Sequence, residues 1–138
     1  MKKLFNNYKK YLTEFVQIKS VSTDSSCVSQ VERAANYLEE LLESLGFDAR
    51  IIRGEETNPY VFAEYHLSAK AKTVLVYGHY DVQPAQKEAG WHSDPFTVEE
   101  RGDKLFGRGI VDNKGQLLIH VMALGELIKA NKLRYNIK

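Results

Sequence analysis

The sequence predicts an α/β domain in which helices pack against a mostly parallel or mixed sheet. Three segments, residues 3–18, 28–45 and 114–130, repeat apolar side chains every three or four positions, which is the period of an amphipathic helix. Shorter apolar and β-branched runs lie between the second and third of these segments and again after the third, and they have the length of strands. Strands that interleave with helices favour the layered α/β class.

The ends of the predicted helices carry their own signals. The serine-rich loop 20–26 offers N-cap side chains to the second helix, because a serine oxygen accepts a hydrogen bond from a free N–H of the first turn. Gly46 and Asn131 follow the second and third helices, where a residue in the left-handed conformation commonly ends a helix.

The predicted strands cover residues 47–53, 60–67, 73–77 and 133–138, and a hairpin spans residues 97–106. Residues 73–77 are apolar without alternation, which is typical of a strand that is buried on both faces. We therefore expect this segment to be a central strand with helices on each side of the sheet.

Composition narrows the class of protein. The 138 residues are 43% hydrophobic and 27% charged, which suits one folded domain. Because 19 basic residues balance 18 acidic ones, we expect no binding to nucleic acid or to an anionic membrane. No apolar run exceeds four residues, so we expect neither a transmembrane helix nor a secretory signal. Cys27 is the single cysteine, which favours a reducing, cytoplasmic location.

The first motif with chemical potential is Gly78-His79-Tyr80-Asp81, directly after the predicted central strand. Sites in open α/β sheets form beyond the carboxyl ends of strands. A carboxylate that holds one ring nitrogen of a histidine leaves the other nitrogen oriented for a metal, and Asp81 is placed to do this for His79. The pattern is short, and a hydrogen-bonded loop histidine beside a turn-forming aspartate explains it as well.

The second motif, residues 107–115, reads Gly-Arg-Gly-Ile-Val-Asp-Asn-Lys-Gly and lies just before the third predicted helix. Asp112 is either the N-cap of that helix or a carboxylate ligand held at its head. A carboxylate has two oxygens and can bridge two cations, which a histidine cannot. The spacing alone leaves both interpretations open.

Together, in this order and with Trp91 and Asp94-Pro95-Phe96 between them, the two motifs closely resemble the dinuclear zinc peptidase superfamily of aminoacylases, carboxypeptidases and dipeptidases. Residues 77–84 look most like its carnosinase-like dipeptidase branch, and the resemblance covers nearly the whole chain. It implies a three-layer α/β/α zinc-peptidase-like domain with a mixed sheet. It also implies two zinc ions as cofactors, with cobalt or manganese as alternatives, and hydrolysis of dipeptides or related N-acyl amino acids by a zinc-activated water.

The resemblance assigns a role to each matched residue. His79 is implied to bind one zinc, Asp81 to orient that histidine as part of the catalytic machinery, and Asp112 to bridge both zincs. It also implies a cis peptide bond between Asp112 and Asn113.

The ligand count falls short of the family's pattern. Two zincs that share one carboxylate need about five protein ligands, and the sequence supplies His79 and Asp112. The family takes its general-base glutamate and remaining ligands from later segments, whereas the Glu-Glu pairs here precede Asp112 and are predicted to be solvated surface (Glu39-Glu40, Glu55-Glu56 and Glu99-Glu100). We expect residues 1–138 to be the N-terminal portion of a metallopeptidase catalytic domain, truncated and without the lid domain. Its zinc sites would be unoccupied or weakly occupied, and it would be inactive alone.

Three other functions remain open: an amidohydrolase or deacylase of the same superfamily, a non-catalytic folded fragment, and an α/β ligand-binding domain without a metal. The expected partners are a small peptide substrate and a second copy of the chain, which would associate through an exposed strand edge.

Overall fold

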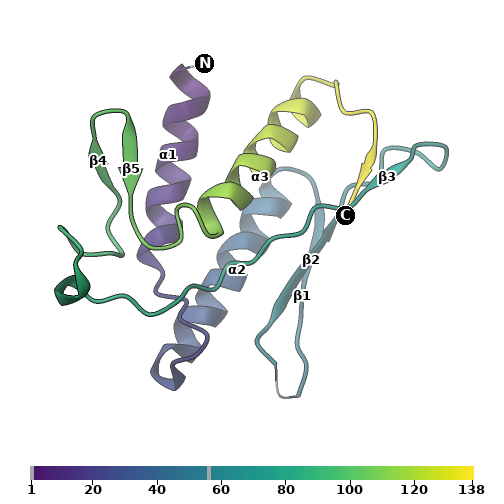
Figure 1. Ribbon diagram of the computed structural model, residues 1–138. Helices are drawn as coiled ribbons and strands as arrows, with labels where there is room; N and C mark the ends of the chain where they lie inside the picture. Colours follow the sequence, from purple (N-terminus) through teal and green to yellow (C-terminus); the bar gives the residue numbers. More distant parts are fainter. Residues whose placement is uncertain (1, 56) are drawn as a thin grey trace.

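The computed structural model describes residues 2–55 and 57–138, so that Glu56, from one predicted surface pair, lies outside the described residues (Figure 1). The three predicted helices are confirmed as α1 (Lys2–Gln17), α2 (Val28–Ser44) and α3 (Lys114–Lys129). Two short 3-10 helices, η1 (Ser25–Cys27) and η2 (Lys87–Ala89), lie in the loops. Within the described ranges, no helix is both long enough and apolar enough to span a membrane.

The helix ends follow the sequence signals with one difference. Gly46 and Asn131 have positive φ angles of 93° and 53°, as expected for residues that end α2 and α3. The serine-rich loop instead forms η1, which Asp24 caps by accepting a hydrogen bond from the Ser26 N–H at 2.9 Å. Cys27 occupies the N-cap position of α2 and makes no side-chain cap bond.

The strands build a mixed arrangement. β1 (Asp48–Ile52) pairs antiparallel with β2 (Tyr60–Glu64), and β3 (Thr73–Val74) pairs parallel with β6 (Asn136–Ile137). An antiparallel bridge between Tyr65 and Ile137 places β6 between β2 and β3. β4 (Glu99–Arg101) and β5 (Lys104–Phe106) form the predicted hairpin.

The core joins all three helices to one face of the strands. Its main cluster combines buried side chains of α1, α2 and α3 (Leu12, Phe15, Val16, Ala34, Leu38, Leu41, Leu118 and Val121, with Ile18). A neighbouring cluster centres on Phe47, Leu133 and Ile137, against which Leu124 and Ile128 of α3 pack. Burial of these apolar side chains is the main favourable term for holding α3, and therefore the loop before it, against the strands.

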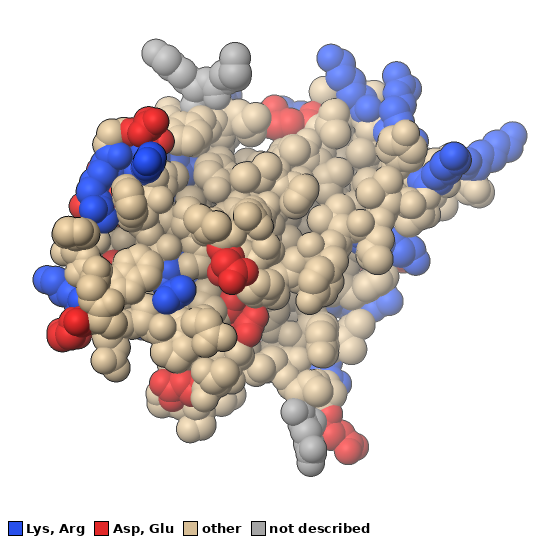
Figure 2. All heavy atoms as spheres, in the orientation of Figure 1, with Lys and Arg blue, Asp and Glu red and all other residues tan. Residues whose placement is uncertain are grey.

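The prediction that residues 73–77 are buried on both faces is wrong. Leu75 and Tyr77 are 76% and 87% exposed, whereas Val76 between them packs into the cluster on the helical side. Among the described residues, helices cover only the face of the strands that Val76 shares. A non-alternating apolar run predicts two covered faces, but it cannot by itself supply the second layer. Figure 2 shows acidic side chains near the middle of the visible face, a broad uncharged area beside them, and lysine and arginine mostly around the rim.

Candidate metal centre

The loop after β3 brings His79 against the start of α3. The backbone N–H of His79 donates a hydrogen bond to Asn113 Oδ1 at 3.3 Å. A Cβ atom at Gly78 would lie 2.8 Å from Asn113 Oδ1 and 2.9 Å from Leu117 Cδ1. Glycine at position 78 therefore permits the close approach of the two predicted motifs.

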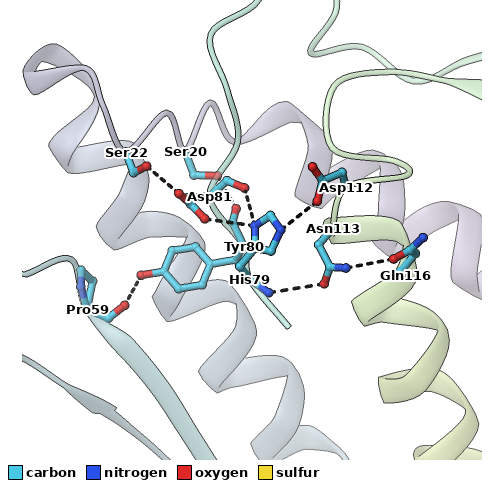
Figure 3. A network of polar contacts seen from close by, with 9 residues as sticks. All are labelled: Ser20, Ser22, Pro59, His79, Tyr80, Asp81, Asp112, Asn113 and Gln116. Carbon is cyan, nitrogen blue, oxygen red and sulfur yellow. Dashed lines mark hydrogen bonds and ion pairs between the residues drawn. The ribbon is translucent and has the colours of Figure 1, made fainter. Parts of the chain in front are cut away.

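The three predicted site residues lie together, with Asp81 and Asp112 on opposite sides of the His79 imidazole ring (Figure 3). His79 Nδ1 lies 3.1 Å from Asp81 Oδ1 and 3.2 Å from the Asp81 carbonyl oxygen. On the other side of the ring, Nε2 lies 2.9 Å from Asp112 Oδ1. The Asp112 side chain is 81% exposed, so its carboxylate faces solvent as well as the ring.

The two carboxylates favour the protonated form of the His79 ring. Burial alone would lower the pKa of His79, but the hydrogen bond to Asp112, the hydrogen bond to the Asp81 backbone and both carboxylate charges together raise it. Ionised carboxylates accept hydrogen bonds and do not donate them, so each ring nitrogen that faces one is favoured to carry a proton. A cation that binds at Nε2 takes the place of one of these protons.

The head of α3 excludes one of the two interpretations of Asp112, that of a helix N-cap. Asn113, and not Asp112, occupies the N-cap position, and its Nδ2 donates to Gln116 Oε1 at 3.0 Å. The Asp112–Asn113 peptide bond is cis, as the family resemblance implies. A Cβ at Gly115 would lie 2.1 Å from the Ile110 carbonyl oxygen, so glycine is required where the loop packs on the helix. Asp112 is therefore free of helix capping.

Lys114, for which the sequence predicts no role in the site, holds the same loop in place. Its side chain is fully buried, and Nζ donates to the carbonyl oxygens of Phe15 at 2.9 Å and Ile18 at 2.6 Å. Burial lowers the pKa of Lys114 from 10.5 to about 7, although the charge of Asp81 opposes the shift. The lysine ties the start of α3 to the end of α1. The Asp-x-Lys-Gly spacing was visible in the sequence, but the partners lie about a hundred residues away.

The second set of residues that sequence reasoning missed is the segment 20–22. Ser20 is fully buried, its Oγ donates to the Tyr80 carbonyl oxygen at 2.7 Å, and its carbonyl oxygen accepts the Val82 N–H at 3.0 Å. Val21 and Val82 form a parallel bridge. Ser22 Oγ then donates to Asp81 Oδ2 at 2.5 Å. In the sequence these serines resembled ordinary loop and cap residues, and no local signal distinguishes them.

The donors His79 Nε2 and the Asp112 carboxylate fit a divalent zinc in type, but they are fewer than one zinc site needs. An imidazole nitrogen and a carboxylate oxygen are both zinc donors, and Asp81 already engages Nδ1, which leaves Nε2 directed at Asp112. Across residues 2–55 and 57–138, no three His, Cys, Asp or Glu side chains converge in a way that could hold a metal ion. The described residues therefore supply two donors toward a site that needs about three per zinc.

Both motifs lie in the segment of the chain that matches the model of a peptidase family. Residues 75–138 match the model of peptidase family M20/M25/M40, and the chain is homologous to the amino-terminal part of the dipeptidases of this family. The Cys-Gly metallodipeptidase of Candida albicans is 38% identical over 121 residues, which are 78% of this chain and 25% of that protein. The succinyl-diaminopimelate desuccinylase of Rickettsia canadensis is 35% identical over 127 residues, which are 90% of this chain and 32% of that protein.

A solved structure extends the comparison to the fold. Human carnosine dipeptidase 1 superposes with a TM-score of 0.87 and 28% identity, covering 99% of this chain and 32% of the human chain. The chain thus spans about a quarter to a third of the length of the relatives it matches. The α/β fold of a metallopeptidase domain, predicted from the sequence, is confirmed over this part.

Proposed function

We propose that residues 1–138 form the part of a metal-dependent dipeptidase that carries His79 and Asp112 as metal ligands, and that the 138-residue chain is inactive alone. The observation that carries the proposal is the convergence of His79 Nε2 and Asp112 Oδ1 to 2.9 Å while Asp81 engages the opposite ring nitrogen. The dipeptidase relatives support dipeptides as the substrate class.

Each residue of the centre has a defined task in this proposal. Asp81 holds the proton on Nδ1, so that Nε2 presents its lone pair outward. Asp112 supplies a carboxylate with two oxygens, of which the exposed side chain can offer both to cations. A bound divalent zinc supplies Lewis acidity, which polarises a scissile carbonyl and activates water. We propose two zinc ions, with cobalt or manganese as substitutes, because the imidazole and carboxylate donors suit all three metals.

Deacylation of an N-acyl amino acid is the second candidate function. The 35% identity with the Rickettsia desuccinylase supports it, because that relative covers 90% of the chain. The two candidates use the same centre and differ in the groups that recognise the acyl portion of the substrate.

The location of the protein in the cell and its association with a second copy can also be proposed. We propose a cytoplasmic location, for which the single cysteine is the support. We also propose that two copies of the chain associate through the exposed edge at β3 and the residues that follow it, where Leu75 and Tyr77 present apolar side chains to solvent.

Two chimeras test the proposed function. Residues 1–138 replace the matching part of the Candida dipeptidase in one and of the Rickettsia desuccinylase in the other, and each is assayed with Cys-Gly and with succinyl-diaminopimelate. We expect the dipeptidase chimera to hydrolyse Cys-Gly when zinc is added. In this chimera, His79→Ala should lower the rate of hydrolysis about a thousandfold. His66→Ala, the same change at an exposed histidine of the loop after β2, is the matched control and should leave turnover unchanged.

Two outcomes contradict the proposal. A folded dipeptidase chimera that keeps its activity after His79→Ala excludes His79 as a ligand. Activity of the desuccinylase chimera alone, with succinyl-diaminopimelate, favours deacylation instead. Circular dichroism of each chimera beside its parent enzyme establishes that the hybrid is folded.

A further inference from the structure

Ser22 lies outside both motifs, yet its hydroxyl contacts the carboxylate that holds His79 (Figure 3). We infer that Ser22 is a positioning residue of the metal centre, which fixes the Asp81 carboxylate and, through it, the direction of the His79 ring. The inference rests on the proposed function, in which His79 Nε2 binds metal.

The two oxygens of Asp81 have different partners. Oδ1 faces His79 Nδ1 at 3.1 Å, and Oδ2 accepts the Ser22 hydroxyl at 2.5 Å. The χ2 torsion of an aspartate is broad, so a carboxylate held at one oxygen still turns about its Cβ–Cγ bond. A partner on each oxygen fixes the plane of the carboxylate. The contact with Ser22 has the short length of a hydrogen bond from a hydroxyl to an ionised acceptor, which is among the stronger kinds.

The backbone that carries Ser22 is anchored independently of its hydroxyl. The buried Ser20 binds the Tyr80 carbonyl oxygen and the Val82 N–H, and Val21 pairs with Val82. Val21 and Val82 are both buried with Phe96 in a small cluster of their own. Removal of the Ser22 hydroxyl therefore leaves the segment 20–22 in place, and Ser22→Ala changes one contact of the centre.

The His79 ring itself gives the first readout. In the zinc-free 138-residue chain labelled with ¹⁵N, we follow exchange with water of the Nδ1–H proton, with His79→Gln to assign the signal. We expect Ser22→Ala to speed this exchange about fivefold or more, because the acceptor of the proton is no longer fixed. Ser22→Thr, which keeps a hydroxyl, should restore the slow exchange. Ser29→Ala, an exposed serine of α2, is the matched control.

Zinc affinity gives the second readout, and a double-mutant cycle shows whether Ser22 acts through Asp81. We expect Ser22→Ala to weaken Zn²⁺ binding about three- to tenfold, less than the loss of a direct partner of the ligand, for which 10- to 100-fold is usual. In an Asp81→Asn background, Ser22→Ala should add no further loss.

The inference is overturned if Ser22→Ala leaves both proton exchange and zinc affinity unchanged, or if it weakens zinc binding equally in the Asp81→Asn background. A wild-type chain whose His79 signals ignore zinc contradicts the proposed function instead. In that case proton exchange in the zinc-free chain still decides the role of Ser22.

Discussion

Gly78→Ala adds one methyl group at the point where the two motifs touch. Gly78 has no positive φ, so alanine can adopt its backbone conformation and the effect comes from the added atom. The new Cβ would lie 2.8 Å from Asn113 Oδ1 and 2.9 Å from Leu117 Cδ1, and ordinary contacts begin at 3.4 Å. The Asn113 side-chain amide is held by the His79 N–H and by Gln116 Oε1, so it cannot turn away without breaking these hydrogen bonds. We therefore expect the head of α3 to retreat by about 0.6 Å from the loop that carries His79.

The retreat has two measurable consequences. Overpacking of this size costs about 1–3 kcal/mol, and we expect urea titration to show a decrease of that order in the free energy of unfolding. Because Asn113 directly follows Asp112, the two donors also separate, and we expect zinc affinity to fall about tenfold. Isothermal titration with zinc, or His79 resonances in the ¹⁵N spectrum, measures the second effect.

Gly125→Ala is the matched control. Its Cβ would lie 2.8 Å from Leu45 Cδ2, which is the flexible end of a side chain, and position 125 is in the interior of α3. Alanine gains about 1 kcal/mol of helix propensity there, so we expect little net change in stability and none in zinc affinity. If Gly78→Ala binds zinc as tightly as the wild type, close approach of the loops does not set the donor geometry, and the reasoning fails.

Three further predictions use other parts of the structure. Lys114→Met should remove a pH dependence of the free energy of unfolding. The folded state lowers the pKa of Lys114 from 10.5 to about 7, so the unfolded chain binds the proton more strongly. Wild-type stability therefore rises from pH 7 toward pH 10. Urea titrations should then show the stability of wild type over variant growing by about 2 kcal/mol between pH 7.5 and pH 9, and a constant difference contradicts the shift. Leu75→Ser combined with Tyr77→Ser should abolish concentration-dependent self-association in analytical ultracentrifugation, whereas Ile119→Ser, at an exposed position of α3, should not. Equal association of the wild type and both variants refutes the surface around Leu75 and Tyr77, which follows β3, as the interface. Asp81→Asn should weaken zinc binding about 10- to 100-fold with little loss of helix content by circular dichroism, and unchanged affinity excludes Asp81 as the orienting group.

Sequence periodicity was sufficient to predict the helices. It was insufficient for residues 73–77, which are not buried on both faces and of which only Thr73–Val74 form the strand β3. Helical stripes bury against whichever neighbours the fold provides, so their period survives changes of context. Burial of Leu75 and Tyr77 depends on a second covering layer, which the composition of the strand itself does not contain.

In the metal centre, too, some features could be predicted from the sequence and others depend on the fold. Residue type and local spacing left the roles of His79 and Asp112 open, and the resemblance to the zinc peptidase superfamily assigned these roles and that of Asp81. The structure brings the three residues together. Ser22 and Lys114 could not be predicted, because their partners lie 59 and about a hundred residues away along the chain. Contacts of that kind appear only once the fold has joined the segments.

The proposed function requires His79 and Asp112 to bind the same metal ion. Four-ligand zinc sites release about 10–16 kcal/mol, and two of four donors supply roughly half, which corresponds to a dissociation constant between micromolar and submillimolar. The most direct test is a zinc titration of the chain followed at His79 Nε2 by ¹⁵N and at the Asp112 carboxylate carbon by ¹³C. We predict that both signals shift with one dissociation constant in that range. A response of only one residue, or of neither at millimolar zinc, contradicts the claim.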